Sequence, residues 1–137
     1  MKTTVHRLFV KTDGADMIKI LRPDFVFEDE RGSLVQLVRE GYRQINVVTS
    51  RAGVERGRHY HALNREGFYV VEGAFRVEAK LGDRKETFRF VKGDMFIIEP
   101  MVVHTFDYEE DSVLVAFYDR GVELPDGTKD IIAEDNG

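Results

Sequence analysis

The stretch 53–73, GVERGRHYHALNREGFYVVEG, holds a pair of histidines and a glutamate at a spacing that could do chemistry. His59 and His61 are two residues apart, and residues at this spacing on a strand point to the same side. The segment ALNR predicts a turn into an antiparallel strand that begins near Glu66 and returns its carboxylate toward the imidazoles. His104, on an apolar strand face farther along the chain, is a candidate fourth group.

Two kinds of chemistry suit these four groups. Three imidazoles and a carboxylate form a ligand set for a divalent ion such as Zn, Mn, Fe or Ni, with open positions for water or substrate. The histidines also suit proton transfer, because histidine titrates near about pH 6.5 and both donates and accepts protons at neutral pH. One imidazole nitrogen cannot bind a cation and accept a proton at once. Without a metal, His59 is the best base and Glu66 orients or charges an imidazole. With a metal, the base lies elsewhere, and the candidates are Tyr69, Tyr108, Tyr118 and Asp107.

The alternative to a functional site is a set of unrelated histidines. An isolated histidine on a half-apolar strand is more often a hydrogen-bonded core or surface residue than a ligand. Three of the four histidines, however, fall in the predicted set with Glu66. Each ionisable side chain buried on one inward face must be paired, neutralised or ligated, so the clustering favours a functional site. His6, in a polar N-terminal stretch, is expected to be an ordinary surface residue.

Composition and charge narrow the class of protein. The 137 residues, 42% hydrophobic and 33% charged, predict one folded domain. Its core is expected over about 25–120, and 121–137 is expected to be a polar, loosely packed tail without chemistry. The chain has no cysteine, which excludes disulfides, thiolate ligands and cysteine nucleophiles. A net charge of -5 opposes binding to nucleic acid. No stretch is typical of a signal peptide or a membrane span, so a cytoplasmic location without a membrane partner is expected.

Proline and glycine divide the chain into segments of strand length. The clearest strand covers 74–81, AFRVEAKL, in which apolar and charged residues alternate. The turn GDRK and the segment 86–91, ETFRFV, complete a hairpin. Further strands are predicted over 17–20, 25–29, 33–38, 44–50, 67–72, 95–99, 103–108 and 112–118. About ten short antiparallel strands without an amphipathic helix predict an all-β sandwich or barrel.

The histidine motif resembles that of the cupins, whose fold is a double-stranded β-helix, or jelly-roll barrel. Five residues reproduce the first cupin motif: Gly53, His59, His61, Glu66 and Gly73. The second motif is matched in its spacing from Gly93 to His104. It departs at three neighbouring positions, where Glu99 stands for the motif's proline, Pro100 follows one position late and Met101 replaces the motif's glycine. The shape of this turn is therefore open, whereas the histidine spacing is kept.

A narrower resemblance covers about 29–120. The segments DERGSLVQL, GVERGRHYH, IEPMVVHTF and DSVLVAFYD are similar to RmlC-like cupins that act on nucleotide sugars: sugar 3,4-ketoisomerases and the epimerase domain of capsular-sugar reductases. The resemblance implies a nucleoside-diphosphate 4-keto-6-deoxy sugar as substrate, no organic cofactor and a homodimer. It also implies acid/base work for His59 and His61 and a diphosphate contact for Arg31. Glu66 departs from the ketoisomerases and matches the capsular epimerase domain, which resembles a zinc site.

The expected activity is 3,4-ketoisomerisation or C3 epimerisation in surface-polysaccharide sugar biosynthesis. Both reactions remove a proton next to a ketone and pass through an enediolate or enolate. The predicted catalytic residues are His59, His61, Tyr69 and Tyr108, and the predicted substrate-binding residues are Arg31, Arg56, Arg58 and Tyr118. Guanidinium groups match phosphate oxygens bidentately, although each arginine can instead belong to a solvated strand edge, and Arg58 can point outward with Tyr60.

Two other functions stay open from the sequence. A cupin of this kind can bind a metal and a small ligand without turnover. Two histidines and a carboxylate can also hold iron(II) in a dioxygenase. If the chain is a dimer, an exposed N-terminal strand over 17–20 is a candidate for pairing between subunits.

Overall fold

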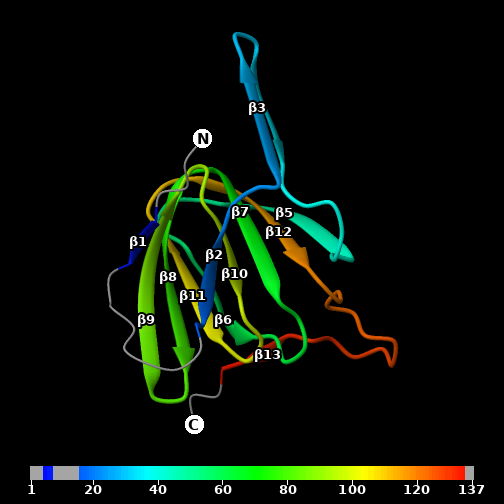
Figure 1. The fold of residues 1–137 in the computed structure, drawn as a ribbon. Helices are drawn as coiled ribbons and strands as arrows, with labels where there is room; N and C mark the ends of the chain where they lie inside the picture. The colour runs from blue at the N-terminus through cyan, green and yellow to red at the C-terminus, as the bar shows by residue number, and fades with distance from the viewer. Residues whose placement is uncertain (1–4, 8–15, 135–137) are drawn as a thin grey trace.

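The strands form two antiparallel sheets around one interior (Figure 1). The structure, a computed structural model, describes residues 5–7 and 16–134. The larger sheet has the order β1 (Val5–Arg7), β9 (Arg84–Val91), β8 (Ala74–Leu81), β11 (Val103–Tyr108), β6 (Glu55–Tyr60) and β13 (Ile132–Ala133). The smaller sheet has the order β2 (Ile18–Leu21), β10 (Met95–Ile98), β7 (Glu66–Glu72), β12 (Ser112–Tyr118) and β5 (Gln44–Ser50). No helix occurs within the described ranges, and none there could cross a membrane. The predicted all-β jelly-roll class is confirmed.

Phenylalanines fill most of the interior. Six phenylalanines belong to the main core cluster, and each is at most 5% exposed: Phe68, Phe75, Phe88, Phe90, Phe96 and Phe106. Phe90 and Phe96 stack between the two sheets with ring centroids 3.8 Å apart. Burial of each such side chain contributes about 1.5–3 kcal/mol. At one end of the barrel, the inward positions of β7 and β11 change from Phe68 and Phe106 to Glu66 and His104, so that end carries the polar groups.

A β-bulge in β6 places the first histidine. Along the pairing of β6 with β11, His59 lies opposite His104, but the next pair is Gly57 with Thr105, so Arg58 is the extra residue. Both bulge residues have left-handed backbones, with φ of 109° at Gly57 and 58° at Arg58. A Cβ at Gly57 would collide with the backbone carbonyl of His104. Only glycine therefore allows the two histidine strands to approach this closely.

The turn 99–102 keeps a glycine-like shape although it departs from the second cupin motif. Met101 has φ of 71°, in the left-handed region that glycine favours. Its backbone N–H donates to the carbonyl of His61 over 2.7 Å. Glu99 accepts a hydrogen bond of 2.7 Å from Arg65 and pairs with Lys19 at 3.2 Å. The substituted turn is thus tied to the segment that holds the histidine pair.

The hairpin of β3 (Phe25–Asp29) and β4 (Gly32–Gln36) stands away from the barrel (Figure 1). Its apolar side chains Phe25, Phe27 and Leu34 are about half exposed. The predicted strand over 33–38 ends earlier, at residue 36. Residues 37–42 then cover the outer face of the smaller sheet, where Leu37, Val38 and Tyr42 pack with Tyr69, Met95 and Phe117. The predicted strand over 17–20 pairs with β10 of its own chain and forms one edge of that sheet.

Over its described residues 121–134, the C-terminal segment is mostly exposed, as predicted, but it is anchored to the barrel at particular residues. Val122 and Asp130 are buried, and β13 pairs with β6 next to Tyr60 and His59. The tail has no alternating pattern because hydrogen bonds to the 61–65 segment hold it, rather than an apolar face. At the other end of the chain, the backbone of His6 pairs with Arg89, and the side chain of His6 lies outside the description.

Candidate active site and metal centre

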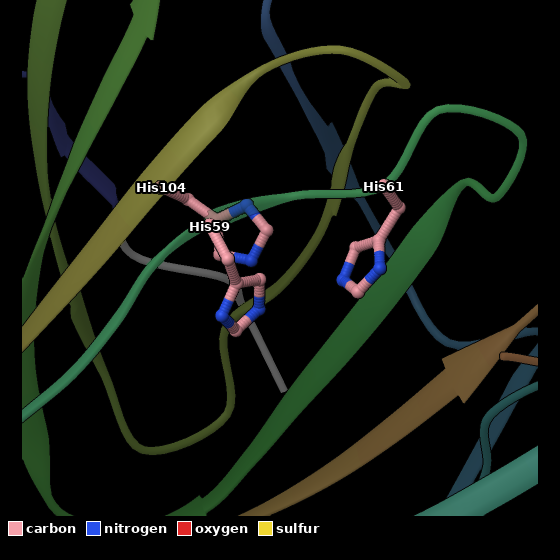
Figure 2. Close-up of side chains that lie close together, drawn as sticks. All are labelled: His59, His61 and His104. Atoms are coloured by element: carbon pink, nitrogen blue, oxygen red, sulfur yellow. The ribbon is translucent and has the colours of Figure 1, made fainter. Parts of the chain in front are cut away.

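Three imidazoles converge inside one end of the barrel (Figure 2). His59 comes from β6, His61 from the residue after β6, and His104 from β11. One ring nitrogen from each lies within 4.8 Å of the others. His61 and His104 are almost fully buried, whereas His59 keeps partial exposure. His59 is therefore the imidazole that a substrate can reach most easily.

The carboxylate of Glu66 joins two of these rings. Its Oε1 lies 3.0 Å from Nε2 of His61 and 3.5 Å from Nε2 of His104. Glu66 is the first residue of β7, and Tyr118 lies opposite it on β12. The hydroxyl of Tyr118 donates a hydrogen bond to the same carboxylate. His61, His104 and Tyr118 thus surround the buried carboxylate of Glu66.

Backbone carbonyls hold the far side of each ring. Nδ1 of His61 lies 2.6 Å from the carbonyl oxygen of Asp130, and Nδ1 of His104 lies 3.1 Å from that of Val102. The ring of His59 bonds the carbonyl of Gly57. A carbonyl only accepts hydrogen bonds, so Nδ1 carries a proton in His61 and His104, and Nε2 faces Glu66. This is the orientation that metal-binding histidines commonly have.

Burial and the shared carboxylate give the four groups different pKa values. Burial lowers the pKa of His104 to about 4, against the attraction of Glu66. Burial, helped by repulsion from His61, also lowers the pKa of His59. Burial opposes charge on His61 and Glu66 as well, but their mutual hydrogen bond outweighs it, raising the pKa of His61 and lowering that of Glu66. At neutral pH His59 and His104 are therefore neutral acceptors, whereas Glu66 is ionised and favours the protonated form of His61.

A cavity of about 150 Å³ opens beside these groups. Its polar lining residues are Arg56, His59, Glu66, His104, Tyr108 and Tyr118. Its apolar lining residues are Val48, Phe68, Phe106 and Leu114. Burial and the charge of Glu66 raise the pKa of Tyr118, so its hydroxyl stays protonated. The cavity thus offers a neutral base, a protonated hydroxyl and an apolar wall to one guest.

The predicted arginines fall in three different places. Arg56 lines the cavity, where its Nε donates to Ser50 over 2.8 Å and its guanidinium also bonds the carbonyl of Thr49. Arg58 does not line the cavity, because the bulge turns it outward to pair with Glu55 at 2.7 Å. Arg31 lies at the tip of the projecting hairpin, paired with Asp29, and does not line the cavity of its own chain.

The tyrosines divide in the same way. Tyr108 and Tyr118 line the cavity. Tyr69 does not, because side chains alternate along β7 and Tyr69 points to the outer face, where it packs with Met95 and Phe117. Asp107 lies on the exposed side of β11. The catalytic role predicted for Tyr69, and the alternative base Asp107, are therefore not supported within one chain.

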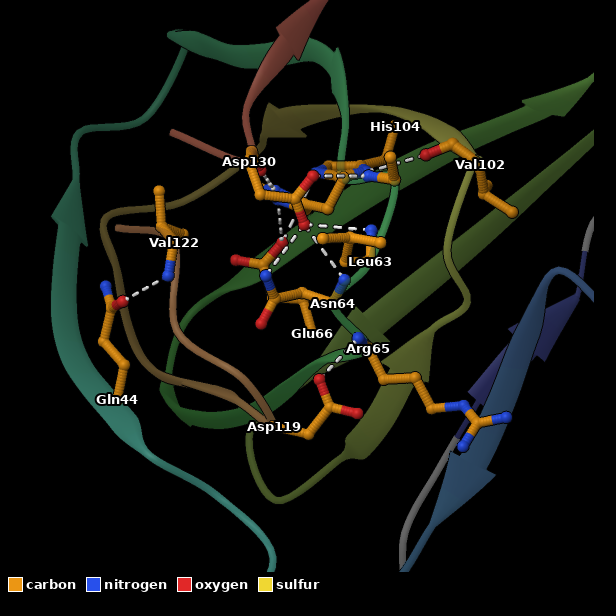
Figure 3. Close-up of polar contacts among 12 residues, drawn as sticks. Gln44, Leu63, Asn64, Arg65, Glu66, Val102, His104, Asp119, Val122 and Asp130 are labelled. Carbon is orange, nitrogen blue, oxygen red and sulfur yellow. Dashed lines mark hydrogen bonds and ion pairs between the residues drawn. The ribbon is translucent and has the colours of Figure 1, made fainter. Parts of the chain in front are cut away.

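The prediction of the site overlooked Asn64 and Asp130. Both are buried polar residues: Asp130 bonds the turn between His61 and Glu66, and Asn64 belongs to that turn and bonds Asp130 and Gly121 (Figure 3). The turn residues ALNR lie between two candidate ligands, which is the one local signal that pointed to Asn64. Asp130 had no such signal, because it lies more than 60 residues from the groups that it bonds.

The donor set fits a divalent metal ion. Neutral imidazole nitrogens and one carboxylate are ligands that zinc and other first-row ions accept. His59 and His104 are neutral and have lone pairs available for a cation, whereas His61 would release its Nε2 proton on binding one. Carbonyl contacts to Nδ1 leave Nε2 of His61 and His104 to face the centre. Glu66 supplies the negative charge. The residues that would hold the ion are His59, His61, Glu66 and His104.

His104 predicts a pH dependence of stability in metal-free protein. Its pKa falls from 6.5 to about 4 on folding, so the unfolded state binds more protons within that window. The contribution of His104 to stability is therefore present above pH 6.5 and is lost toward pH 4, by roughly 3 kcal/mol at most. Urea unfolding with a chelator between pH 7 and 5 should show a shallower pH slope for His104→Gln than for the unchanged protein. Equal slopes would contradict the assignment.

Comparison with known proteins agrees with this architecture. The chain is similar to a 3,4-ketoisomerase from Helicobacter canadensis, with a TM-score of 0.72 and 17% identity over 86% of this chain and 90% of the other. It is similar to the sugar 3,4-ketoisomerase QdtA from Thermoanaerobacterium thermosaccharolyticum in complex with TDP, with a TM-score of 0.71 and 18% identity over 88% and 89%. A dTDP-4-dehydrorhamnose 3,5-epimerase from Sulfolobus tokodaii gives a TM-score of 0.65 and 22% identity over 86% and 75%. The predicted likeness to this group of cupins is confirmed at the level of the fold.

Sequence comparison adds the family. No curated protein matches the chain. The family described as polysaccharide biosynthesis C-terminal domain matches residues 27–120. This range includes most of the barrel and the four site residues His59, His61, Glu66 and His104. The chain belongs to the polysaccharide biosynthesis C-terminal domain family.

Proposed function

We propose that the protein is an isomerase or epimerase of a nucleoside-diphosphate 4-keto-6-deoxy sugar in polysaccharide biosynthesis. The observation that carries the proposal is the environment of His59, a partly exposed imidazole with a lowered pKa that lines a small cavity together with Arg56. The fold shared with 3,4-ketoisomerases and a 3,5-epimerase, and the polysaccharide family, support the same reading.

The proposed reaction begins with removal of the proton at C3, next to the C4 ketone. His59 accepts it, because a neutral imidazole is the form that acts as a base. The ion pair of His61 and Glu66 stays in place at the rear of the cavity. Tyr118 holds its proton and hydrogen-bonds Glu66, so it fixes the carboxylate while presenting its ring to the guest. Return of the proton to C4, with transfer of the O3 hydroxyl proton to O4, gives the 3-keto isomer. Protonation of C3 from the opposite face by a second donor gives the epimer.

The size of the cavity determines which part of the substrate enters. Pockets that enclose whole drug-sized ligands usually measure about 300–1,000 Å³. At about 150 Å³ this cavity admits the sugar and leaves the nucleotide outside. The apolar wall suits the C6 methyl group of a deoxy sugar, and Arg56 suits the first phosphate.

We also propose that a divalent metal ion binds this site. When bound, such an ion supplies Lewis acidity toward oxygens of the sugar. His61, His104 and Glu66 are the core of the proposed ligand set, since Glu66 contacts both imidazoles. His59 is either the fourth ligand or the base, and it cannot be both through one nitrogen.

A second candidate function is a cupin that binds a metal and a small ligand without turnover. It is favoured by the closeness of all three imidazoles, whose nitrogens lie within 4.8 Å of one another. If every imidazole is a ligand, the polar groups left to the cavity are Arg56, Tyr108 and Tyr118. Burial raises the pKa of both tyrosines, which makes them poor bases at neutral pH.

The proposed assembly is a homodimer, and the proposed location is the cytoplasm. Ile45 and Val47 on the edge strand β5 are 63% and 71% exposed. The projecting hairpin adds Phe25, Phe27 and Leu34. Apolar surface on a sheet edge invites pairing with another chain. The substrate contact predicted for Arg31 requires such a partner, because the hairpin carries Arg31 away from its own cavity.

Proton exchange tests the proposed reaction. Incubation with a thymidine- or uridine-diphosphate 4-keto-6-deoxyhexose in deuterated water should place deuterium at C3, or at C4 of a 3-keto product, as read by NMR. His59→Asn should slow this exchange by about 10²- to 10⁴-fold, the usual contribution of a positioned base. Arg58→Gln is the control and should exchange at the normal rate, because Arg58 is turned outward. Ligand-induced melting shifts without exchange would favour the binding cupin instead.

Elemental analysis of protein purified without chelator tests the metal. We expect about one divalent ion per chain, lost in Glu66→Gln because the variant removes the anionic ligand. In His59→Asn, retained metal with lost exchange would identify His59 as the base, whereas loss of both would identify it as a ligand. A metal-free protein with full exchange activity would contradict the metal proposal.

Sedimentation measurements test the dimer. Val47→Asp should weaken dimerisation by tenfold or more, which corresponds to about 1.4 kcal/mol, because it places a charge in the apolar edge. Leu81→Asp, at the exposed end of β8, is the matched control and should leave the assembly unchanged. A monomer at all concentrations in the unchanged protein would contradict the dimer.

A further inference from the structure

The turn 62–65 is held by one carboxylate of the C-terminal segment. Asp130 accepts the backbone N–H of Ala62 at Oδ1 over 2.8 Å. Its Oδ2 accepts the backbone N–H groups of Leu63 and Asn64, each over 3.0 Å. Figure 3 shows the carboxylate among these donors. Since the turn connects His61 directly to Glu66, a contact that fixes the turn also fixes the separation of these two residues.

Asn64 locks the turn to the tail from the other side. Its Nδ2 donates to Oδ2 of Asp130 over 2.8 Å and to the carbonyl of Gly121 over 2.9 Å. Its Oδ1 accepts the backbone N–H groups of Arg120 and Gly121, each over 3.0 Å. Asn64 is 1% exposed and Asp130 is 3% exposed. Every hydrogen-bonding group of the Asn64 side chain is therefore used between two chain segments more than 50 residues apart.

Independent contacts hold the backbone of Asp130 in place. Its N–H donates to the carbonyl of Val122 over 2.8 Å, and the N–H of Val122 donates to the side chain of Gln44 over 2.8 Å. The carbonyl oxygen of Asp130 lies 2.6 Å from Nδ1 of His61. One residue thus contacts the imidazole through its backbone and the turn behind that imidazole through its side chain.

We propose that Asp130 is a positioning residue of the site: its carboxylate fixes the 62–65 turn, and its carbonyl accepts the Nδ1–H of His61, so that the ring is oriented with Nε2 toward Glu66. The segment 121–134 is thereby part of the site and not an appendage. The inference concerns the His61–Glu66 geometry on which the proposed function also depends, but it requires no substrate and no turnover.

Nitrogen NMR of metal-free protein labelled in its histidines tests the proposal at one fixed pH. The unchanged protein should show His61 protonated at Nδ1 in a single ring state. Asp130→Asn replaces one acceptor oxygen with an amide that faces donors, so the His61 signals should shift and broaden as the ring loses its single orientation between the Asp130 carbonyl and Glu66. The signals of His104, which is held by Val102, should stay in place. Asp126→Asn is the matched control, because Asp126 is exposed in the same segment and bonds only Thr128 among the described contacts.

Zinc affinity of the same variants gives a second readout. Loss of a group that orients a metal-binding histidine usually weakens metal binding by about 10- to 100-fold. We expect a loss in this range for Asp130→Asn and none for Asp126→Asn. Unchanged His61 signals together with unchanged zinc affinity in a folded Asp130→Asn would overturn the proposal. If that variant does not fold, Asn64→Ala replaces it. A shift of His61 there supports the proposal, and an unmoved His61 overturns it.

The two readouts separate this proposal from the proposed function. The NMR experiment contains neither substrate nor metal, so a protein without isomerase activity still answers it. Conversely, whether or not the His61 signals move in Asp130→Asn, the deuterium exchange experiment can still succeed or fail.

Discussion

A buried carboxylate is the constraint around which this barrel end is arranged. Glu66 is 5% exposed and ionised, and an unpaired charge at such depth would be strongly unfavourable. One imidazole and one hydroxyl compensate for it: His61 by a hydrogen bond and Tyr118 across the sheet. The neutral ring of His104 lies 3.5 Å from the same oxygen. Those partners cannot move without exposing the charge to an apolar interior. The rigid placement of the histidines therefore follows from the cost of burying Glu66, and the same placement suits a cation that would complete the compensation.

Backbone geometry contributes as much as the side chains. The bulge at Gly57 brings His59 opposite His104, and the left-handed Met101 ties the following turn to the carbonyl of His61. Carbonyl groups of Gly57, Val102 and Asp130 then orient the three rings. A site built in this way is preorganised, since its polar groups already face one point before any guest enters.

The two halves of the molecule have different surface chemistry. The end of the barrel that holds the histidines has a small cavity, which is lined by Arg56, His59 and apolar side chains. The outer edge exposes Ile45, Val47 and the projecting hairpin. The hairpin separates Arg31 from the cavity of its own chain, so a substrate contact through Arg31 depends on assembly. In the proposed enzyme, the β3–β4 hairpin would therefore serve both in dimerisation, through its apolar side chains, and in substrate binding, through Arg31.

The sequence by itself determined the strands, the faces of most side chains and the candidate set His59, His61, Glu66 and His104, because alternation and turn residues are local properties. The same rule, applied to β7, would have placed Tyr69 outside, since Glu66 and Phe68 point inward. Only the tertiary structure decided that Arg31 and Arg58 lie outside the cavity and that the C-terminal segment holds the 62–65 turn. Asp130 bonds residues 66 to 68 positions away, and hydrogen bonds over such separations leave no periodic pattern in the chain.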